Sequence, residues 1–279
     1  MTGLTVVRLS LKEAVRRRLL LAGIVLSVAF VVLFWLGFSS LYGRAAGQQD
    51  RLMVVFAGGI MTVLGLYVVQ FLGGFASLFL SVGAVSSEID SGTLHAVLAR
   101  PLSRASWLLQ RWLAFAVTVA IYTVVMGGAL LLIARGVAGY QAVDPLRALG
   151  LLVLEVLVLL SLGLLGSTLW STLANGAVVF SLFGLAWLAG IIEFAGDTVG
   201  NTAMRNMGIA VSLLVPSDAL WRGASYYLQS PAFLGASAGS GGIPFAASAP
   251  PSPALIAWSL GYVAVLLSLA AARFTRRDL

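Results

Sequence analysis

The chain has 279 residues, of which 60% are hydrophobic and only 10% are charged, a composition far from that of a soluble globular protein. Its net charge is +7, but the basic residues lie between apolar blocks, which argues against nucleic-acid binding and favours a membrane protein. Cysteine is absent and His95 is the only histidine, which excludes disulfides, zinc sites and iron–sulfur clusters. Lys12, the only lysine, does not follow a glycine, so a phosphate-binding P-loop is excluded as well.

Residues 1–18 precede the first apolar run and have an amphipathic pattern. The apolar side chains between Leu4 and Val15 share one helical face, beside a basic stripe that contains Arg8 and Lys12. This pattern predicts a helix that lies along the inner leaflet, and the alternative is a simple cytoplasmic extension of the first span. The apolar run that follows is too long for a signal peptide, so we expect it to remain as a membrane anchor.

Six apolar segments are long enough to cross the hydrocarbon core of a bilayer, which takes roughly 20 residues of helix. We expect the second segment to be one long or tilted helix, because a break at Gly73 and Gly74 would leave a piece too short to cross. The whole chain is therefore predicted to be a single all-α, polytopic membrane domain. Its six predicted spans are 19–38, 52–85, 112–134, 148–170, 176–194 and 254–272.

The basic residues indicate an orientation for these spans. If both termini are cytoplasmic, the inner segments hold eleven of the seventeen Arg and Lys residues and the outer segments hold six. Basic residues accumulate on the cytoplasmic side of membrane proteins. Both termini are therefore predicted to lie in the cytoplasm, with the chain in the cell membrane.

The longest segment between spans, 195–253, is predicted to be extracytoplasmic and has two parts. In the first part, Pro216 and Ser217 start a helix whose apolar residues continue at helical spacing to Leu228. Three aromatic residues of this helix suit the outer membrane interface: Trp221, Tyr226 and Tyr227. The second part, 230–253, is rich in Gly, Ser, Ala and Pro and is predicted to be a mobile loop.

Between the second and third spans lies a polar island, 86–107, which is acidic at its start and basic at its end. Glu88 and Asp90 lead into a Ser-Gly-Thr turn and then a short apolar helix. Pro101 ends this helix, and Ser103 is suited to cap the next one. By the orientation given above, the island lies in the cytoplasm.

The short helix of the island has one apolar face, formed by Leu94, Val97 and Leu98. A helix of two turns is not stable alone in water, so this face should be docked on another surface. Two alternatives are open at this point: the surface belongs to a partner protein, or it belongs to other helices of the same chain.

The stretch from Glu88 to Arg104, EIDSGTLHAVLARPLSR, closely resembles the cytoplasmic signature of permease subunits of type-2, exporter-class ABC transporters. The basic N-terminus, the six spans, the long second span and the extended segment before the last span are also similar to that family. The resemblance therefore covers nearly the whole chain.

The resemblance implies a coupling helix at 93–99 that seats in a groove of a separate ATP-binding subunit. ATP and Mg would bind to that partner, so this chain would carry no cofactor, no metal and no catalytic residue. Two ATP-binding subunits and a second permease copy or paralogue are implied. His95 and Ala96 stand where larger or acidic residues are frequent, so partner specificity is not carried over. The coupling residues that the resemblance indicates are Glu88, Thr93, Leu94, Val97, Leu98, Arg100, Pro101, Ser103 and Arg104.

Glu155 is the only carboxylate well inside a predicted span. A charge there costs on the order of a few kcal/mol, so the side chain should face the bundle or a wet cavity. Three roles are open: a hydrogen bond to a neighbouring helix, a place in a substrate pathway, or proton coupling. Proton coupling would make the chain a secondary transporter, the alternative to an ATP-driven exporter, although no matching pair of broken helices supports it. A scaffold without transport is a third class, and the sequence indicates no substrate.

Overall fold

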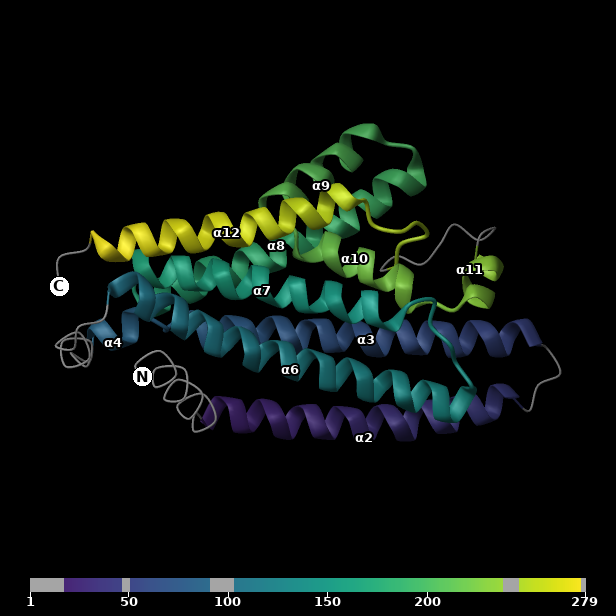
Figure 1. Cartoon of the computed structure of the whole chain (residues 1–279). Coiled ribbons are helices and arrows are strands. Elements are labelled where there is room, and N and C mark those ends of the chain that lie inside the picture. Colours follow the sequence, from purple (N-terminus) through teal and green to yellow (C-terminus); the bar gives the residue numbers. More distant parts are fainter. Residues whose placement is uncertain (1–17, 47–50, 91–102, 238–245, 277–279) are drawn as a thin grey trace.

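The computed structural model describes residues 18–46, 51–90, 103–237 and 246–276 (Figure 1). Within these ranges the chain is helical and contains no β-strand. The predicted coupling helix at 93–99 lies outside the described residues, as does the predicted interfacial helix apart from its last residue. The described part of the chain confirms the all-α fold class.

Six helices of the described part are long and apolar enough to cross a membrane, which confirms the number of predicted spans. The second is one unbroken helix through Gly73 and Gly74, as expected, but it ends at Ser81 rather than at residue 85. The six are α2 (Arg18–Ala46), α3 (Arg51–Ser81), α6 (Arg104–Ala138), α7 (Pro145–Leu169), α8 (Thr172–Val199) and α12 (Pro253–Thr275).

Helix α7 is the centre of the bundle and packs against α3, α6, α8 and α12. In its most apolar stretch 67% of the residues are buried, compared with 11% for α2, which lies at the periphery (Figure 1). Asp144 caps the start of α7 by accepting a hydrogen bond from the Arg147 amide, and Pro145 occupies the first turn, where no backbone donor is needed.

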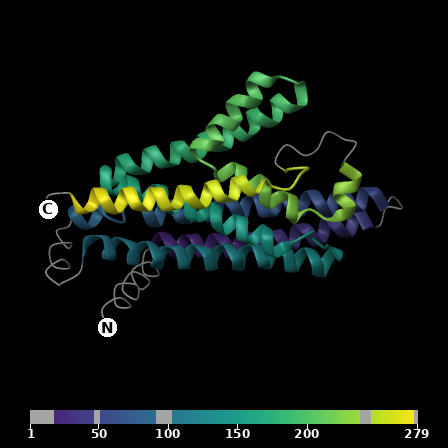
Figure 2. The same ribbon diagram turned by 45° about the horizontal axis from the view of Figure 1, so that its top comes forward.

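Three shorter helices of the described part lie between α8 and the last span. Gly200, with a φ of 68°, ends α8, and the chain then reverses into α9 (Thr202–Leu214). The pair α8–α9 leans away from the other helices, as Figure 2 shows. Helix α10 (Ser217–Leu228) starts where the sequence predicted and lies against α7.

Two expectations for the segment before the last span are wrong. Trp221 does not lie at the surface, because it is 1% exposed and packs on Tyr67 with ring centroids 5.0 Å apart. The stretch after residue 230 is not a loop throughout, because it contains α11 (Pro231–Ser237), whose Phe233 is fully buried beside Phe56 of α3. Both side chains add apolar burial that a solvated loop would lack.

The start of α2, the start of α6 and the end of α12 lie at one end of the bundle (Figure 1). The short helix α4 (Ser86–Asp90) lies at the same end and follows α3 after a tight turn. This is the end from which the predicted coupling segment leaves the bundle.

Candidate functional site

The chain on the N-terminal side of the predicted coupling helix is fixed to α6 by a largely buried ion pair. Glu88 of α4 pairs with Arg111 of α6, whose side chain is only 3% exposed. The Arg111 guanidinium also lies over the rings of Trp107 and Phe115, at 5.3 and 5.4 Å from the ring centroids. A buried guanidinium needs such partners, because its desolvation would otherwise cost several kcal/mol.

The same cluster holds the end of the last span. The ring of Trp107 lies 5.6 Å from that of Phe274, which is fully buried near the C-terminal end of α12. Val85, in the turn before α4, belongs to this apolar cluster as well. The segment that leads into the predicted coupling helix is thus packed between α6 and α12.

Two further contacts fix this segment to α8. The hydroxyl groups of Ser86 and Thr172 lie 2.7 Å apart. The side-chain amide of Asn175 donates to the backbone carbonyl of Val82 at 2.8 Å and to that of Gly163 at 2.9 Å. Asn175 is fully buried, and its position depends on the absence of a side chain at Gly166, where an added Cβ would overlap the amide oxygen. The turn between α3 and α4 is therefore joined to α6, α7 and α8.

Three of the predicted coupling residues lie within the described part of the chain. Glu88 faces Arg111 of its own chain, which sequence reasoning did not anticipate. Ser103 caps α6, as predicted, by accepting a hydrogen bond from the Ser106 amide at 3.3 Å. Arg104 is the first residue of α6 and is partly buried. The others lie outside the described residues: Thr93, Leu94, Val97, Leu98, Arg100 and Pro101.

Glu155 lies in the middle of the bundle and is fully buried, which confirms that it faces inward rather than toward lipid. Its Oε1 accepts a hydrogen bond of 2.9 Å from the side-chain amide of Gln70 on α3. Among the described residues, its Oε2 and the Oε1 of Gln70 have no hydrogen-bond partner. The two side chains therefore make one interhelical hydrogen bond, and both of these oxygens can still accept a hydrogen bond from another donor.

A second charged cluster, which the sequence analysis missed, joins α8 to α10. Arg222 of α10 lies 3.1 Å from Asp218 and 3.5 Å from Glu193 of α8, and it donates to the backbone carbonyl of Gly190. Burial raises the pKa of Asp218 from its ordinary 3.8 to about 7, against the opposing effect of Arg222. Asp218 and Arg222 stand four residues apart on a predicted helix, a spacing that brings two side chains together. The sequence therefore did contain a signal for this ion pair.

A cleft of about 660 Å³ opens beside this cluster. Glu193 and Arg222 supply its polar wall, and Leu213, Pro251 and Trp258 are among the residues of its apolar wall. Such a combination suits an amphipathic small molecule. Among the described residues, no three His, Cys, Asp or Glu side chains lie close enough together to hold a metal ion.

Comparison with known proteins agrees with this architecture. The sequence profile of a family described as "ABC-2 family transporter protein" matches residues 4–279, which is nearly the entire chain. A comparison with curated proteins finds no match. Because the family profile spans all six membrane-crossing helices of the described part and the predicted coupling segment, the chain belongs to the ABC-2 transporter family and is a multi-pass membrane permease.

Proposed function

We propose that this permease is the membrane-spanning subunit of an ATP-driven exporter and that it couples to a separate ATP-binding subunit through residues 86–107. ATP and Mg would bind to that partner. Two ATP-binding subunits and a second copy or paralogue of the permease would complete the transporter. Membership of the ABC-2 family supports this function in general.

The observation that carries the proposal is the largely buried ion pair between Glu88 and Arg111. A coupling helix transmits force only if its connection to the membrane helices is stiff. Here the described part of the connection, residues 82–88, is fixed by the ion pair and by the Ser86 and Asn175 hydrogen bonds. A displacement of the coupling helix would therefore pass into α3, α6 and α8 together rather than be lost in a flexible linker.

The orientation remains part of the proposal. The eleven-to-six distribution of basic residues favours a cytoplasmic location for both termini and for the coupling segment in the cell membrane. The start of α2 and the end of α12 lie at one end of the bundle, in agreement with termini on a common side. The cleft beside Arg222 and the buried Glu155 would then be candidate parts of the substrate pathway.

The coupling face can be tested with one substitution and a matched control. Val97→Asp places a charge on the face formed by Leu94, Val97 and Leu98, whose burial is worth roughly 1.5–3 kcal/mol for each side chain. We expect the tagged variant to reach the membrane but to lose the ATP-binding subunit that co-purifies with the wild-type chain. Ala96→Asp, which helical spacing puts on the opposite side of the predicted helix, should keep it. Equal retention by both variants would refute the coupling assignment.

Glu155→Gln separates the exporter from a proton-coupled transporter. Glutamine keeps the size and hydrogen-bonding capacity of the side chain, so its bond to Gln70 can form, but it carries no ionisable proton. For an ATP-driven exporter, we expect ATP hydrolysis by the purified complex in liposomes to ignore an imposed pH gradient in both proteins. Uptake driven by the gradient without ATP, and abolished by Glu155→Gln, would favour the secondary transporter instead.

A further inference from the structure

One face of α6 points away from the bundle and carries an apolar stripe. Ile121, Val125 and Leu132 are 59%, 62% and 70% exposed and recur at helical spacing. Gly128 and Arg135 continue the same stripe, at positions seven and fourteen residues after Ile121. In the single chain these side chains are open to the surrounding lipid, and Gly128 and Arg135 lie on the same side of α6.

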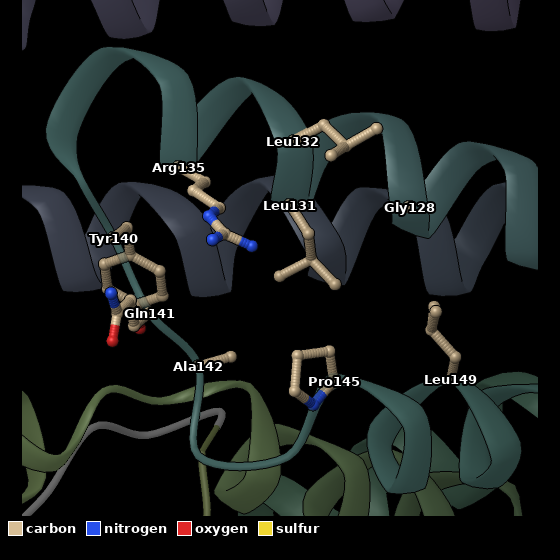
Figure 3. Close-up of a pocket in the computed structure, with 9 residues that line it drawn as sticks. All are labelled: Gly128, Leu131, Leu132, Arg135, Tyr140, Gln141, Ala142, Pro145 and Leu149. Atoms are coloured by element: carbon tan, nitrogen blue, oxygen red, sulfur yellow. The ribbon is translucent and has the colours of Figure 1, made fainter.

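A cavity of about 460 Å³ opens along this stripe, between the end of α6 and the start of α7 (Figure 3). Its part further from the loop between α6 and α7 is apolar and includes Gly128, Leu131 and Leu149. An added Cβ at Gly128 would meet nothing within 4 Å, so no neighbouring side chain fills the notch that this glycine leaves in the stripe. The cavity is therefore open on the side of α6 that faces lipid.

The other part of the cavity is polar and carries one formal charge. It is lined by Arg135, Tyr140 and Gln141, and Figure 3 shows the Arg135 guanidinium over the space between α6 and the loop that leads to α7. Burial raises the pKa of Tyr140 to about 12, so this side chain is neutral. The described residues that line the cavity include no carboxylate, so none of them forms an ion pair with Arg135. Arg147, by contrast, lies 3.1 Å from Asp144.

The wall opposite Arg135 is held in place by the end of α10. The Tyr140 hydroxyl donates to the Leu228 carbonyl at 3.0 Å. The amides of Val143 and Asp144 donate to the carbonyls of Gln229 and Tyr227 at 2.9 and 3.1 Å. The polar part of the cavity is thus preformed, so little ordering would be needed when a ligand binds.

The geometry points to a site for an anionic phospholipid from the adjacent leaflet. Seven residues of helix separate Arg135 from Gly128, a rise of about 10 Å. Arg135 at the end of the span is thus at head-group level, while Gly128 lies at the level of the upper acyl chains. Arg135 would bind the phosphate, and the methylene groups would pack on Gly128, Leu131 and Leu149. Since no carboxylate lines the cavity to receive an ammonium group, a lipid without one is favoured.

The site can be tested on the purified full chain with phosphatidylglycerol as the probe and native mass spectrometry as the readout. We expect Arg135→Gln to weaken retention of one lipid about fivefold, the effect of one basic residue near a membrane surface. Arg147→Gln is the matched control, because that arginine is already paired, and it should retain the lipid as the wild type does. Gly128→Leu should fill the notch and weaken retention while the melting temperature is unchanged. Phosphatidylcholine should be retained less than phosphatidylglycerol.

Three results would overturn the proposal. Equal loss of lipid in Arg135→Gln and Arg147→Gln would show general electrostatic attraction rather than a site. Displacement of phosphatidylglycerol by millimolar inorganic phosphate would show a site for a free anion. Because the native chain has no cysteine, a Gly128→Cys variant can be oxidised cleanly. Efficient disulfide formation between two copies, unaffected by the lipid, would show that this face is a protein interface.

Discussion

Arg111 and Arg222 are both largely buried, but the two regions around them balance the arginine charge differently. Arg111 pairs with the Glu88 carboxylate and lies over two aromatic rings. Arg222 has two carboxylate neighbours, Asp218 and Glu193, and the Gly190 carbonyl. Aromatic rings thus lie against the arginine in the first region, whereas two carboxylates share one arginine in the second. The first region is a fixed joint between α4 and α6, and the second changes its charge near neutral pH because the pKa of Asp218 is raised to about 7.

The largest effect is expected where the fixed joint is broken. Arg111→Gln removes the largely buried cation from its ion pair with Glu88 and from the rings of Trp107 and Phe115, which should lower the free energy of unfolding by about 3 kcal/mol. Titration with SDS, followed by circular dichroism, measures this change. Arg205→Gln is the control, because Arg205 and Asp197 are both more than half exposed and such pairs are worth less than about 1 kcal/mol. Similar losses in both variants would show that Arg111 is not a joint.

A smaller effect, in pH dependence, should come from the second region. Because the pKa of folded Asp218 is about 7 and its ordinary value is 3.8, the folded protein holds this proton more tightly than the unfolded chain does. The resulting stabilisation is complete below about pH 4 and is lost as the pH rises through 7. Asp218 should therefore make the protein about 2 kcal/mol more stable at pH 5 than at pH 8.

Asp218→Asn should remove this part of the pH dependence. Melting temperatures in detergent at pH 5, 6.5 and 8 measure it for the wild type and the variant. Glu193 and Arg222 stay in place in the variant, so any pH dependence that they cause is common to both proteins. An unchanged difference between pH 5 and pH 8 in Asp218→Asn would refute the assignment.

The smallest effect concerns the contact that positions Asp218. Gly190 of α8 lies against the Asp218 carboxylate, and an added Cβ would overlap it. Gly190→Ala should destabilise the protein by about 1 kcal/mol and also weaken the pH dependence, because the carboxylate is pushed away from its place. Gly184→Ala on the same helix meets nothing within 4 Å and should be neutral or slightly stabilising. If both variants behave alike, α8 and α10 do not pack this closely.

The parts of the fold that depend on local pattern were predictable from the sequence. Length and hydropathy gave the six spans, and the Pro216-Ser217 start of α10 and the Ser103 cap of α6 followed from helix-terminus chemistry. The energetic cost of a charge in lipid was enough to predict that Glu155 faces the inside of the bundle. One local signal was overlooked: Ser230 before Pro231 caps α11, where Ser230 Oγ accepts a hydrogen bond from the Phe233 amide at 3.1 Å.

The rest depends on packing between segments distant in the sequence. Glu88 reaches Arg111 only because α3 ends at Ser81 and a tight turn redirects the chain. Trp221 was assigned to the interface because aromatic residues are common there, but α10 lies against α7 and the ring is covered. Position along a span does not reveal which face another helix will cover. The contact between Gly190 and Asp218 could not be predicted for the same reason, because it depends on which face of α8 is covered by α10.

The hydrogen bond between Gln70 and Glu155 has a consequence for biogenesis. The chain is synthesised from its N-terminus, so α3, with Gln70, enters the membrane before α7 does. The partner of the buried carboxylate of α7 is therefore already made when α7 is inserted, and the bond can form before α8 and α12 follow. Arg222, in contrast, follows both of its acidic neighbours, so its region is completed late in assembly. The centre of the bundle can thus form during translation, and the region around α10 is added to a core that is already in place.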